Sequence, residues 1–556
     1  MKFKYSWLAL VLLGLTACDV NNDLEPILQP EPELAPLNVN GLDFSNYIAV
    51  GASFTAGFTD NALFIAAQEN SFPNILAQKF ALGGGGNFSQ PLMNDNVGGL
   101  LFGGTQIQGP RLFFNGTGPT SLGVFGATPS TDVTVPVTGS VGNYGIPGAK
   151  SFHFVAPGYG NLSAVPLNLA NPYFARFSSG ATATVLGDAV TRQPTFFSLS
   201  EIGGNDVLGY ALAGGTGVSQ EGNIDPSTYG RTDITDTNVF ANVMNNMVTA
   251  LTSNGAKGVV GNLPYITTLA HFTTVPFNPL DPTANTDAGA QLAAQIPLLN
   301  NVYGAINQIY AGAGQPERSI VFSPDGPNAV VVYDEDATDL SMAITSTLAA
   351  SPTFVPFVQS LNLPAAAAPL VAQLLGKQYG KARSATSSDL FVLPSSAIIG
   401  TVNQDAAAQL IADSMGQLPV ALAGQFSAHG VTLPLADRWV LTPQEQEEIR
   451  KATDAYNSTI KALADANDLA FVDFNQVLQE GATSGLKFDR YILTTDLVTG
   501  GLVSLDGVHL TARGYALMAN KFLEAIDEKY GSNFANAVDG LAKADDYPTN
   551  YSPSLR

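Results

Sequence analysis

The sequence predicts an α/β fold built on a mostly parallel, doubly wound sheet. Short apolar runs of strand length alternate with longer segments that have helical periodicity. The clearest apolar runs are residues 47–50, 195–200, 258–263 and 470–474. Strands that alternate with helices are joined by crossovers and therefore lie parallel, and a strand buried on both faces is apolar without alternation.

The helices between these runs have recognisable start signals. The most complete begins at Thr442, which is followed by Pro443 and then by Glu445, the pattern of a capping box. Ser71 stands at the cap position of an earlier helix, and Thr511 at that of a helix near the C-terminus. These signals place helices before and after the apolar runs in the chain. A doubly wound sheet requires this alternation.

The composition is that of a globular chain with long irregular segments. Hydrophobic residues make up 45% of the 556 residues and charged residues 13%, which is enough apolar material for a large core. The length is compatible with two or three average domains or with one large domain that carries insertions. We expect one folded unit, with flanking segments divided as follows: a signal peptide over 1–17, a tether over 18–40, the folded domain over 41–540 and a tail over 541–556.

Two stretches within the folded domain do not follow the strand–helix alternation. Residues 85–141 are rich in Gly, Thr and Asn, which predicts long loops with short strands, or alternatively a small all-β insertion. Residues 276–438 contain Ala- and Pro-rich segments, which predict a mostly helical insertion. The sequence does not determine whether this insertion closes over the site.

The N-terminus has the pattern of a secretory signal. Lys2 and Lys4 precede an apolar run over 7–15 that is too short to span a membrane. The sequence Leu-Thr-Ala-Cys that ends at Cys18 resembles the lipobox of bacterial lipoproteins, and Cys18 is the only cysteine in the chain. We therefore expect lipidation of Cys18 and a protein anchored to a membrane of the cell envelope, the outer membrane on its periplasmic or surface face.

The charge of the chain excludes one class of partner. The formal net charge is −22 at pH 7, and a nucleic-acid partner requires Lys and Arg to neutralise its phosphates. We expect no nucleic acid among the partners. The sequence does not indicate an oligomeric state.

A candidate nucleophile follows the first apolar run. The run 47–50 ends at Gly51, and Ser53 comes two residues later. A tight exit from a strand into a helix places a side-chain hydroxyl at the carboxyl end of a parallel sheet, where ligands of open α/β folds bind. A serine beside a glycine is also common as a helix cap or turn residue, so a base and an oxyanion hole are needed to identify a catalytic role.

A candidate base lies near the C-terminus. Asp506 precedes His509 by three residues on a short turn, so its carboxylate can accept from Nδ1 of the imidazole and leave Nε2 free to take a proton from a serine. The other histidines are His153, His271 and His429, and none has an acid at a comparable spacing. His509 is therefore the predicted base.

The order of four motifs resembles that of the SGNH, or GDSL, family of hydrolases. The motifs are Gly51-Ala52-Ser53, then Asn143-Tyr144-Gly145-Ile146-Pro147-Gly148-Ala149, then Gly203-Gly204-Asn205-Asp206, then Asp506-Gly507-Val508-His509. They are spread over roughly residues 44–530, and Gly-Gly-Asn-Asp directly after an apolar run is the most specific of them. The resemblance implies a three-layer α/β/α fold with a flavodoxin-like sheet and long insertions.

The resemblance also implies the role of each site residue. Ser53 would be the nucleophile, His509 the general base and Asp506 the acid that orients it. The backbone amides of Ser53 and Gly148 and the side-chain amide of Asn205 would form the oxyanion hole. Such donors stabilise the charge that develops on an ester carbonyl oxygen, and losing one typically costs ~10²–10³ in rate.

Ala52 departs from the family pattern, which has aspartate before the serine. The substitution leaves the predicted triad complete, but it removes an acceptor that could hold the nucleophile turn. We expect Asp206 to order its loop rather than to contact substrate. The segment 262–264 resembles another family segment, to which we assign a structural role.

The function that the sequence predicts is that of a serine esterase or lipase. It would hydrolyse a carboxylic ester, either a lipid or an acylated carbohydrate, through an acyl-enzyme and without a metal or cofactor. The alternatives are a carbohydrate or cell-wall O-deacetylase or an acyltransferase of the same fold and, from another class, a non-catalytic binding lipoprotein at the cell surface. A fold alone does not decide among these.

Overall fold

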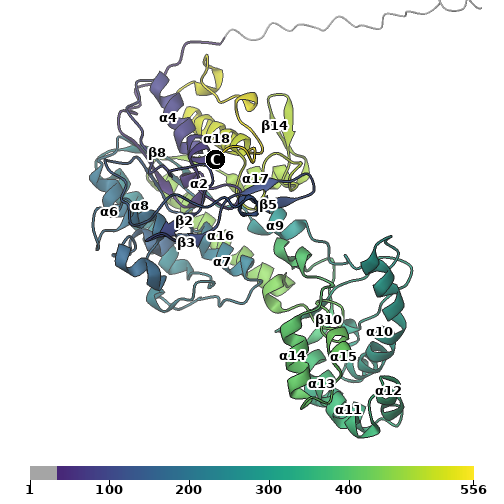
Figure 1. Ribbon diagram of the computed structural model, residues 1–556. Coiled ribbons are helices and arrows are strands. Elements are labelled where there is room, and N and C mark those ends of the chain that lie inside the picture. Colours follow the sequence, from purple (N-terminus) through teal and green to yellow (C-terminus); the bar gives the residue numbers. More distant parts are fainter. Residues whose placement is uncertain (1–33) are drawn as a thin grey trace, which may run out of the picture.

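The computed structural model describes residues 34–556. The predicted signal peptide, Cys18 and most of the predicted tether lie outside the described residues. The chain forms a larger body and a smaller body, which lie apart in Figure 1 and are joined by the segment after residue 273 and at one end of helix α16 (Pro443–Ala466). Each body has its own hydrophobic core.

A sheet of five parallel strands forms the centre of the larger body. Its spatial order is β13 (Ala470–Val472), β8 (Lys257–Gly261), β7 (Phe196–Ser200), β1 (Tyr47–Gly51) and β6 (Asn143–Gly145). All neighbouring strands are parallel. Counted along the chain the order is 2-1-3-4-5, that of a doubly wound flavodoxin-like sheet, with its switch point between β1 and β7. The predicted α/β fold with a parallel sheet is therefore confirmed.

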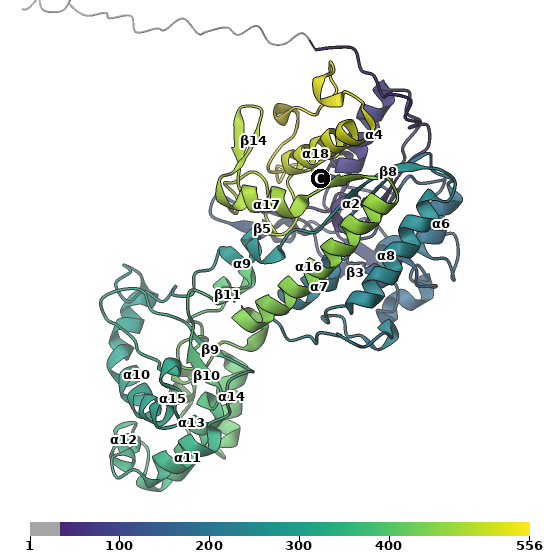
Figure 2. The same ribbon diagram turned by 180° about the vertical axis from the view of Figure 1, so that it is seen from behind.

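Helices cover both faces of this sheet (Figures 1 and 2). Helices α4 (Phe72–Leu82) and α18 (Ala512–Tyr530) pack together on one face, and α8 (Thr237–Thr252) and α16 pack together on the other. Because both faces are covered, every residue of β1 and of β7 is buried. This is the reason that both strands are short apolar runs in the sequence.

The predicted start of α16 has the expected contacts. Thr442 Oγ1 accepts from the amide of Glu445 at 3.4 Å, and the Glu445 carboxylate accepts from the amide of Thr442 at 2.6 Å. Two of the first backbone N–H groups of the helix region are thereby satisfied. The helix then continues for 24 residues and reaches from the smaller body to the sheet (Figure 2).

Shorter elements complete the larger body. Residues 85–141 form loops with two small antiparallel hairpins, β2 (Leu100–Phe102) with β3 (Thr105–Gln108) and β4 (Leu112–Phe114) with β5 (Pro119–Ser121). The remaining helices and strands are α2 (Ser53–Ala56), α3 (Ile65–Glu69), α5 (Pro172–Ala175), α6 (Val185–Thr191), α7 (Gly204–Leu212), α9 (Ala270–Thr273), α17 (Phe474–Thr483), β14 (Leu486–Phe488) and β15 (Tyr491–Leu493).

The smaller body is mostly helical and is formed by residues between 275 and 440. Buried tyrosines lie at its centre, among them Tyr303, Tyr310 and Tyr379. Its elements are α10 (Asp287–Gly312), β9 (Val331–Tyr333), α11 (Ser341–Ala350), α12 (Phe354–Ser360), α13 (Ala368–Tyr379), β10 (Ala382–Ser384), α14 (Gln404–Asp413) and α15 (Val420–Gln425), and β11 (Leu390–Phe391) with β12 (Val440–Leu441) joins it to the larger body.

Within residues 34–556 no single helix has both the length and the apolar character needed to cross a membrane. The bent pair α11 and α12, which meet at 91°, meets that criterion only when the two are taken together, by length and composition.

Candidate active site

Ser53 lies just after strand β1, in a turn that requires glycine at position 51. A Cβ on Gly51 would come within 2.1 Å of Thr55 Oγ1 and 2.6 Å of the Ser200 carbonyl oxygen, so no larger residue fits there. Ser53 is the first residue of α2, and its side chain is almost buried. An amide in the first turn of a helix has no acceptor within the helix, so the backbone N–H of Ser53 is available to a ligand.

Ser53, His509 and Asp506 form a hydrogen-bonded chain. His509 Nε2 lies 2.9 Å from Ser53 Oγ, and His509 Nδ1 lies 2.9 Å from Asp506 Oδ2. The other carboxylate oxygen of Asp506 accepts from the amides of Val508 and His509, at 2.9 and 2.8 Å. The carboxylate thus fixes the turn as well as the ring, and it leaves Nε2 directed at the serine hydroxyl.

The surroundings of Asp506 keep its carboxylate ionised. Burial by itself raises the pKa of Asp506, but the opposing effects of His509 and of the hydrogen bonds from His509 and Val508 hold this pKa well below its usual range. An ionised acceptor at Nδ1 favours the tautomer that carries its proton there. His509 Nε2 is then free to accept the proton of Ser53.

The other histidines do not replace His509. His271 on α9 supports the turn, because its amide donates to the Gly507 carbonyl at 3.0 Å. His153 accepts from the Lys150 amide through Nδ1 at 3.0 Å, and burial lowers its pKa to about 3. His429 lies in the smaller body, where it forms a bridge with Leu433, and it does not line the pocket beside Ser53.

Gly148 lies in the segment after β6 and Asn205 in the first turn of α7, which follows β7; β1 lies between these two strands in the sheet. Asn205 is at the start of α7 and lines the pocket beside Ser53. Its Nδ2 donates to the Ala149 carbonyl at 2.9 Å, which uses one of its two N–H donors. Gly148 has a φ of +78°, is exposed and has open space around it, but it does not line the same pocket. The structure therefore brings Asn205 to the triad and places Gly148 on the adjoining loop.

Two further residues from the sequence motifs have structural contacts. Asp206 is fully buried and accepts from the amide and the hydroxyl of Ser151, at 2.7 and 2.6 Å. Asn262 donates to Asp473 Oδ1 at 2.8 Å and accepts from the Asn475 amide at 3.1 Å. Both side chains connect loops at the carboxyl edge of the sheet.

Glu201 is a site residue that the sequence does not reveal. It directly follows β7, and its Oε1 accepts from the amide of Thr55 at 2.8 Å, within the turn that carries Ser53. Ala52 cannot hold this turn with its own side chain, and a carboxylate from the neighbouring strand does so instead. No sequence signal identifies Glu201, because its role depends on the pairing of β1 with β7.

The Glu201 carboxyl is buried with few partners. Its Oε2 has no hydrogen-bond partner, and the residue adopts a φ of +46°. Burial raises the pKa of Glu201 to about 7, although hydrogen bonding by Thr55, Ser200 and the Ala52 amide opposes this rise. The native state therefore keeps this carboxyl protonated to a higher pH than an exposed glutamate would be.

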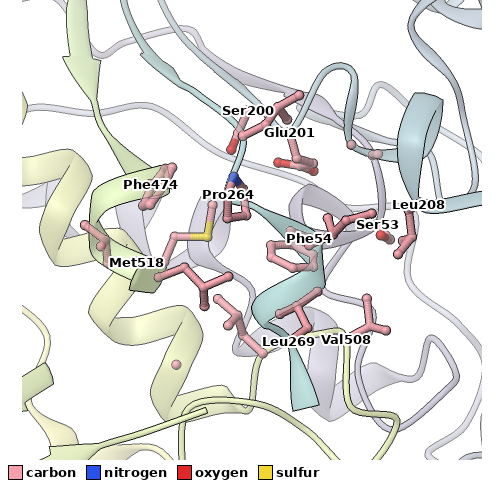
Figure 3. A pocket seen from close by; sticks show the side chains of 18 of the residues that line it. Ser53, Phe54, Ser200, Glu201, Leu208, Pro264, Leu269, Phe474, Val508 and Met518 are labelled. Atoms are coloured by element: carbon pink, nitrogen blue, oxygen red, sulfur yellow. The ribbon is translucent and has the colours of Figure 1, made fainter. Parts of the chain in front are cut away.

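A deep apolar pocket extends from Ser53 into the larger body. The space between its lining residues is about 970 Å³ when the open solvent at its mouth is included. Figure 3 shows Ser53 on one side of the pocket and Met518 and Phe474 on the opposite side. The apolar side chains that line it come from α7, from loops at the sheet edge, from α17 and from α18, and include Leu208, Leu263, Ile266, Leu269, Val477, Leu478, Leu502, Val508, Leu510 and Leu517.

The raised pKa of Glu201 leads to a prediction about stability. The native state holds a proton on Glu201 between its ordinary pKa of 4.5 and about 7, so stability is lost as the pH rises through this window. Glu201→Gln removes the charge but keeps an oxygen that can accept from the Thr55 amide. We expect the free energy of unfolding of this variant, measured with urea, to fall less than that of the wild type between about pH 5 and about pH 8.

Two further variants complete this test. Glu201→Ala removes the acceptor as well and leaves a buried amide unpaired, so it should destabilise the chain by about 1–3 kcal/mol. Glu221→Gln, at an exposed position in the following loop, should leave the pH dependence of the wild type unchanged. If the free energy of unfolding changed with pH equally in Glu201→Gln and in the wild type, the raised pKa of Glu201 would be contradicted.

Comparison with known proteins does not identify a family for this chain. No family model matches it, and neither a curated protein nor a solved structure does. The chemistry of the site is therefore inferred from its geometry.

Proposed function

We propose that this chain is a serine esterase of the SGNH type that hydrolyses carboxylic esters through an acyl-enzyme. One observation carries the proposal: Ser53 Oγ, His509 and Asp506 are joined by two hydrogen bonds of 2.9 Å at the mouth of an apolar pocket. The nucleophile, the base and the orienting acid are thus in the order that acyl transfer requires.

The reaction follows from the positions of these groups. Ser53 Oγ attacks the ester carbonyl carbon while His509 Nε2 takes the hydroxyl proton, and Asp506 stabilises the imidazolium. The C–O bond to the alcohol then breaks, and His509 returns the proton to the departing alkoxide. Water, deprotonated by His509, attacks the acyl-enzyme and releases the acid and the free serine.

The developing oxyanion requires donors that point at the carbonyl oxygen. The Ser53 amide at the start of α2 and the Asn205 side chain beside the pocket are the first two in our proposal. The Gly148 amide on the loop after β6 is the third, and the open space around this glycine permits close approach of a substrate. Donors fixed in advance need no reorganisation during the reaction.

The SGNH assignment is supported by topology together with motif order. The strand order 2-1-3-4-5 places the ends of β1, β6 and β7 side by side, and the first three motifs follow these three strands. The fourth motif reaches the same edge through the turn before α18. The meeting of the four motifs at one edge of the sheet supports the proposed assignment.

The pocket favours an ester with an apolar acyl group. Its walls are almost entirely aliphatic and aromatic, and such a surface gains free energy from each methylene that it removes from water, ~0.8 kcal/mol. An acetylated carbohydrate would leave most of this surface uncovered. We therefore propose a lipid-like substrate and, from the lipobox at Cys18, a location at a membrane of the cell envelope.

The catalytic role of Ser53 can be tested with p-nitrophenyl esters. We expect hydrolysis by the wild type and a loss of at least roughly 10³-fold in kcat/KM for Ser53→Ala, because the variant has no nucleophile. Ser346→Ala, a matched change at an exposed site on α11, should keep the full rate. Background rates for the wild type on every ester, acetylated sugars included, would favour a binding lipoprotein instead.

The acyl pocket can be tested by shortening it. Met518 lies across the pocket from Ser53 (Figure 3), so Met518→Trp should fill the far end. We expect kcat/KM for the laurate ester to fall at least roughly tenfold while that for the acetate ester changes little, because each excluded methylene loses its burial energy. Met342→Trp, at an exposed position on α11, is the control. An equal loss on both esters would contradict the proposed acyl site.

A further inference from the structure

Three carboxylates meet where the smaller body joins the larger one. Glu335 lies in the loop after β9, Asp437 in a short turn of 3₁₀ helix (Asp437–Trp439), and Glu445 in the first turn of α16. One oxygen from each lies within 4.8 Å of the other two. The three residues are far apart in the chain, so the fold has brought like charges together at this point.

Two of these carboxylates have oxygen atoms that are buried and unpartnered. Glu445 is only 3% exposed, and its Oε1 has no hydrogen-bond partner, whereas Oε2 accepts from the Thr442 amide. Asp437 Oδ1 is also buried without a partner. A buried oxygen of this kind costs free energy unless it is paired with a donor or a cation.

The neighbouring basic side chains are directed elsewhere. Among the described residues, none forms an ion pair with any of the three carboxylates. Lys381 donates to the backbone carbonyl of Glu335, and Arg383 pairs with Asp334 and Asp389. Arg438 lies over the Trp439 ring at 5.0 Å. Asp336 and Glu448 add further negative charge nearby.

We propose that Glu335, Asp437 and Glu445 bind one Ca²⁺ ion. Ca²⁺ takes oxygen ligands at about 2.3–2.6 Å, so two of its ligands lie no more than about 5 Å apart, as the three carboxylate oxygens do. Ca²⁺ also accepts irregular geometry and completes its coordination shell with water. Both properties suit a site with three protein ligands, of which Glu335 is exposed to solvent. Mg²⁺ requires shorter distances and a near-ideal octahedron.

The position of the site gives the ion a structural role. The loop after α7 packs against it so closely that a Cβ on Gly215 would come within 2.2 Å of Glu445 Cδ. A Cβ on Gly214 would come within 2.4 Å of the Asp437 carbonyl oxygen. A cation held here would therefore tie the loop after β9, in the smaller body, to α16 and to the end of α7 in the larger one.

The proposal can be tested on the full chain purified in detergent and treated with a chelator. Titration with CaCl₂ in a calorimeter should show one ion per chain. Millimolar CaCl₂ should raise the midpoint of thermal unfolding by about 2–6 °C, because a ligand that binds only the native state stabilises it. The fluorescence of Trp439, two residues from Asp437, should change over the same titration.

Conservative variants separate this site from other effects. Glu335→Gln and Asp437→Asn should weaken Ca²⁺ binding at least roughly tenfold and abolish the thermal shift. Without Ca²⁺ both should be as stable as the wild type or more so, because they relieve repulsion between like charges. Glu317→Gln, an exposed position in the same body, should respond as the wild type does. Ser53→Ala should also bind Ca²⁺ normally, so the result does not depend on the esterase proposal.

Three outcomes would overturn the proposal. The first is the absence of binding heat and of any thermal shift in millimolar CaCl₂. The second is an unchanged response in Glu335→Gln and Asp437→Asn, which would place the ion elsewhere. The third is an equal response to MgCl₂, which would contradict the preference for the larger cation.

Discussion

The hydrogen bond between Ser53 Oγ and His509 Nε2 joins residues 456 positions apart in the chain. Ser53 is placed by strand β1, which pairs with β6 and β7, and His509 is placed by a turn that leads into α18 on one face of the sheet. Neither position exists until β1 is paired and α18 is packed. The site therefore depends on assembly of the whole larger body. Gly51 permits the close approach of Ser200 beside Ser53, and Gly507 permits that of His271 beside His509.

The same edge of the sheet explains how the nucleophile turn is held without an aspartate before Ser53. At the switch point the ends of β1 and β7 lie side by side, so the first residue after β7 can reach the turn after β1. Glu201 does this through the Thr55 amide. This hydrogen bond requires the Glu201 carboxyl to be buried beside an apolar pocket. Burial disfavours the ionised form and raises the pKa of Glu201 to about 7.

The larger features of the fold could be predicted because they depend on local patterns. Buried strands such as β1 and β7 are apolar runs, and the capping box of α16 is readable from three residues. Strand β6 is different, because Asn143–Gly145 is short and polar and becomes a strand only by pairing with β1. Glu201 and the three clustered carboxylates were missed for the same reason, since their partners come from distant parts of the chain.

The two connections to the smaller body lie close to the proposed catalytic groups. The chain leaves the larger body after α9, whose His271 amide holds the Gly507 carbonyl in the turn of the triad. It returns through α16, where Glu448 accepts from the Tyr210 hydroxyl of α7, the helix that begins with Gly204 and Asn205. A displacement of the smaller body would act on both the proposed base and a proposed oxyanion donor. Within residues 34–556, the smaller body does not line the pocket beside Ser53, so it reaches the proposed site through this junction.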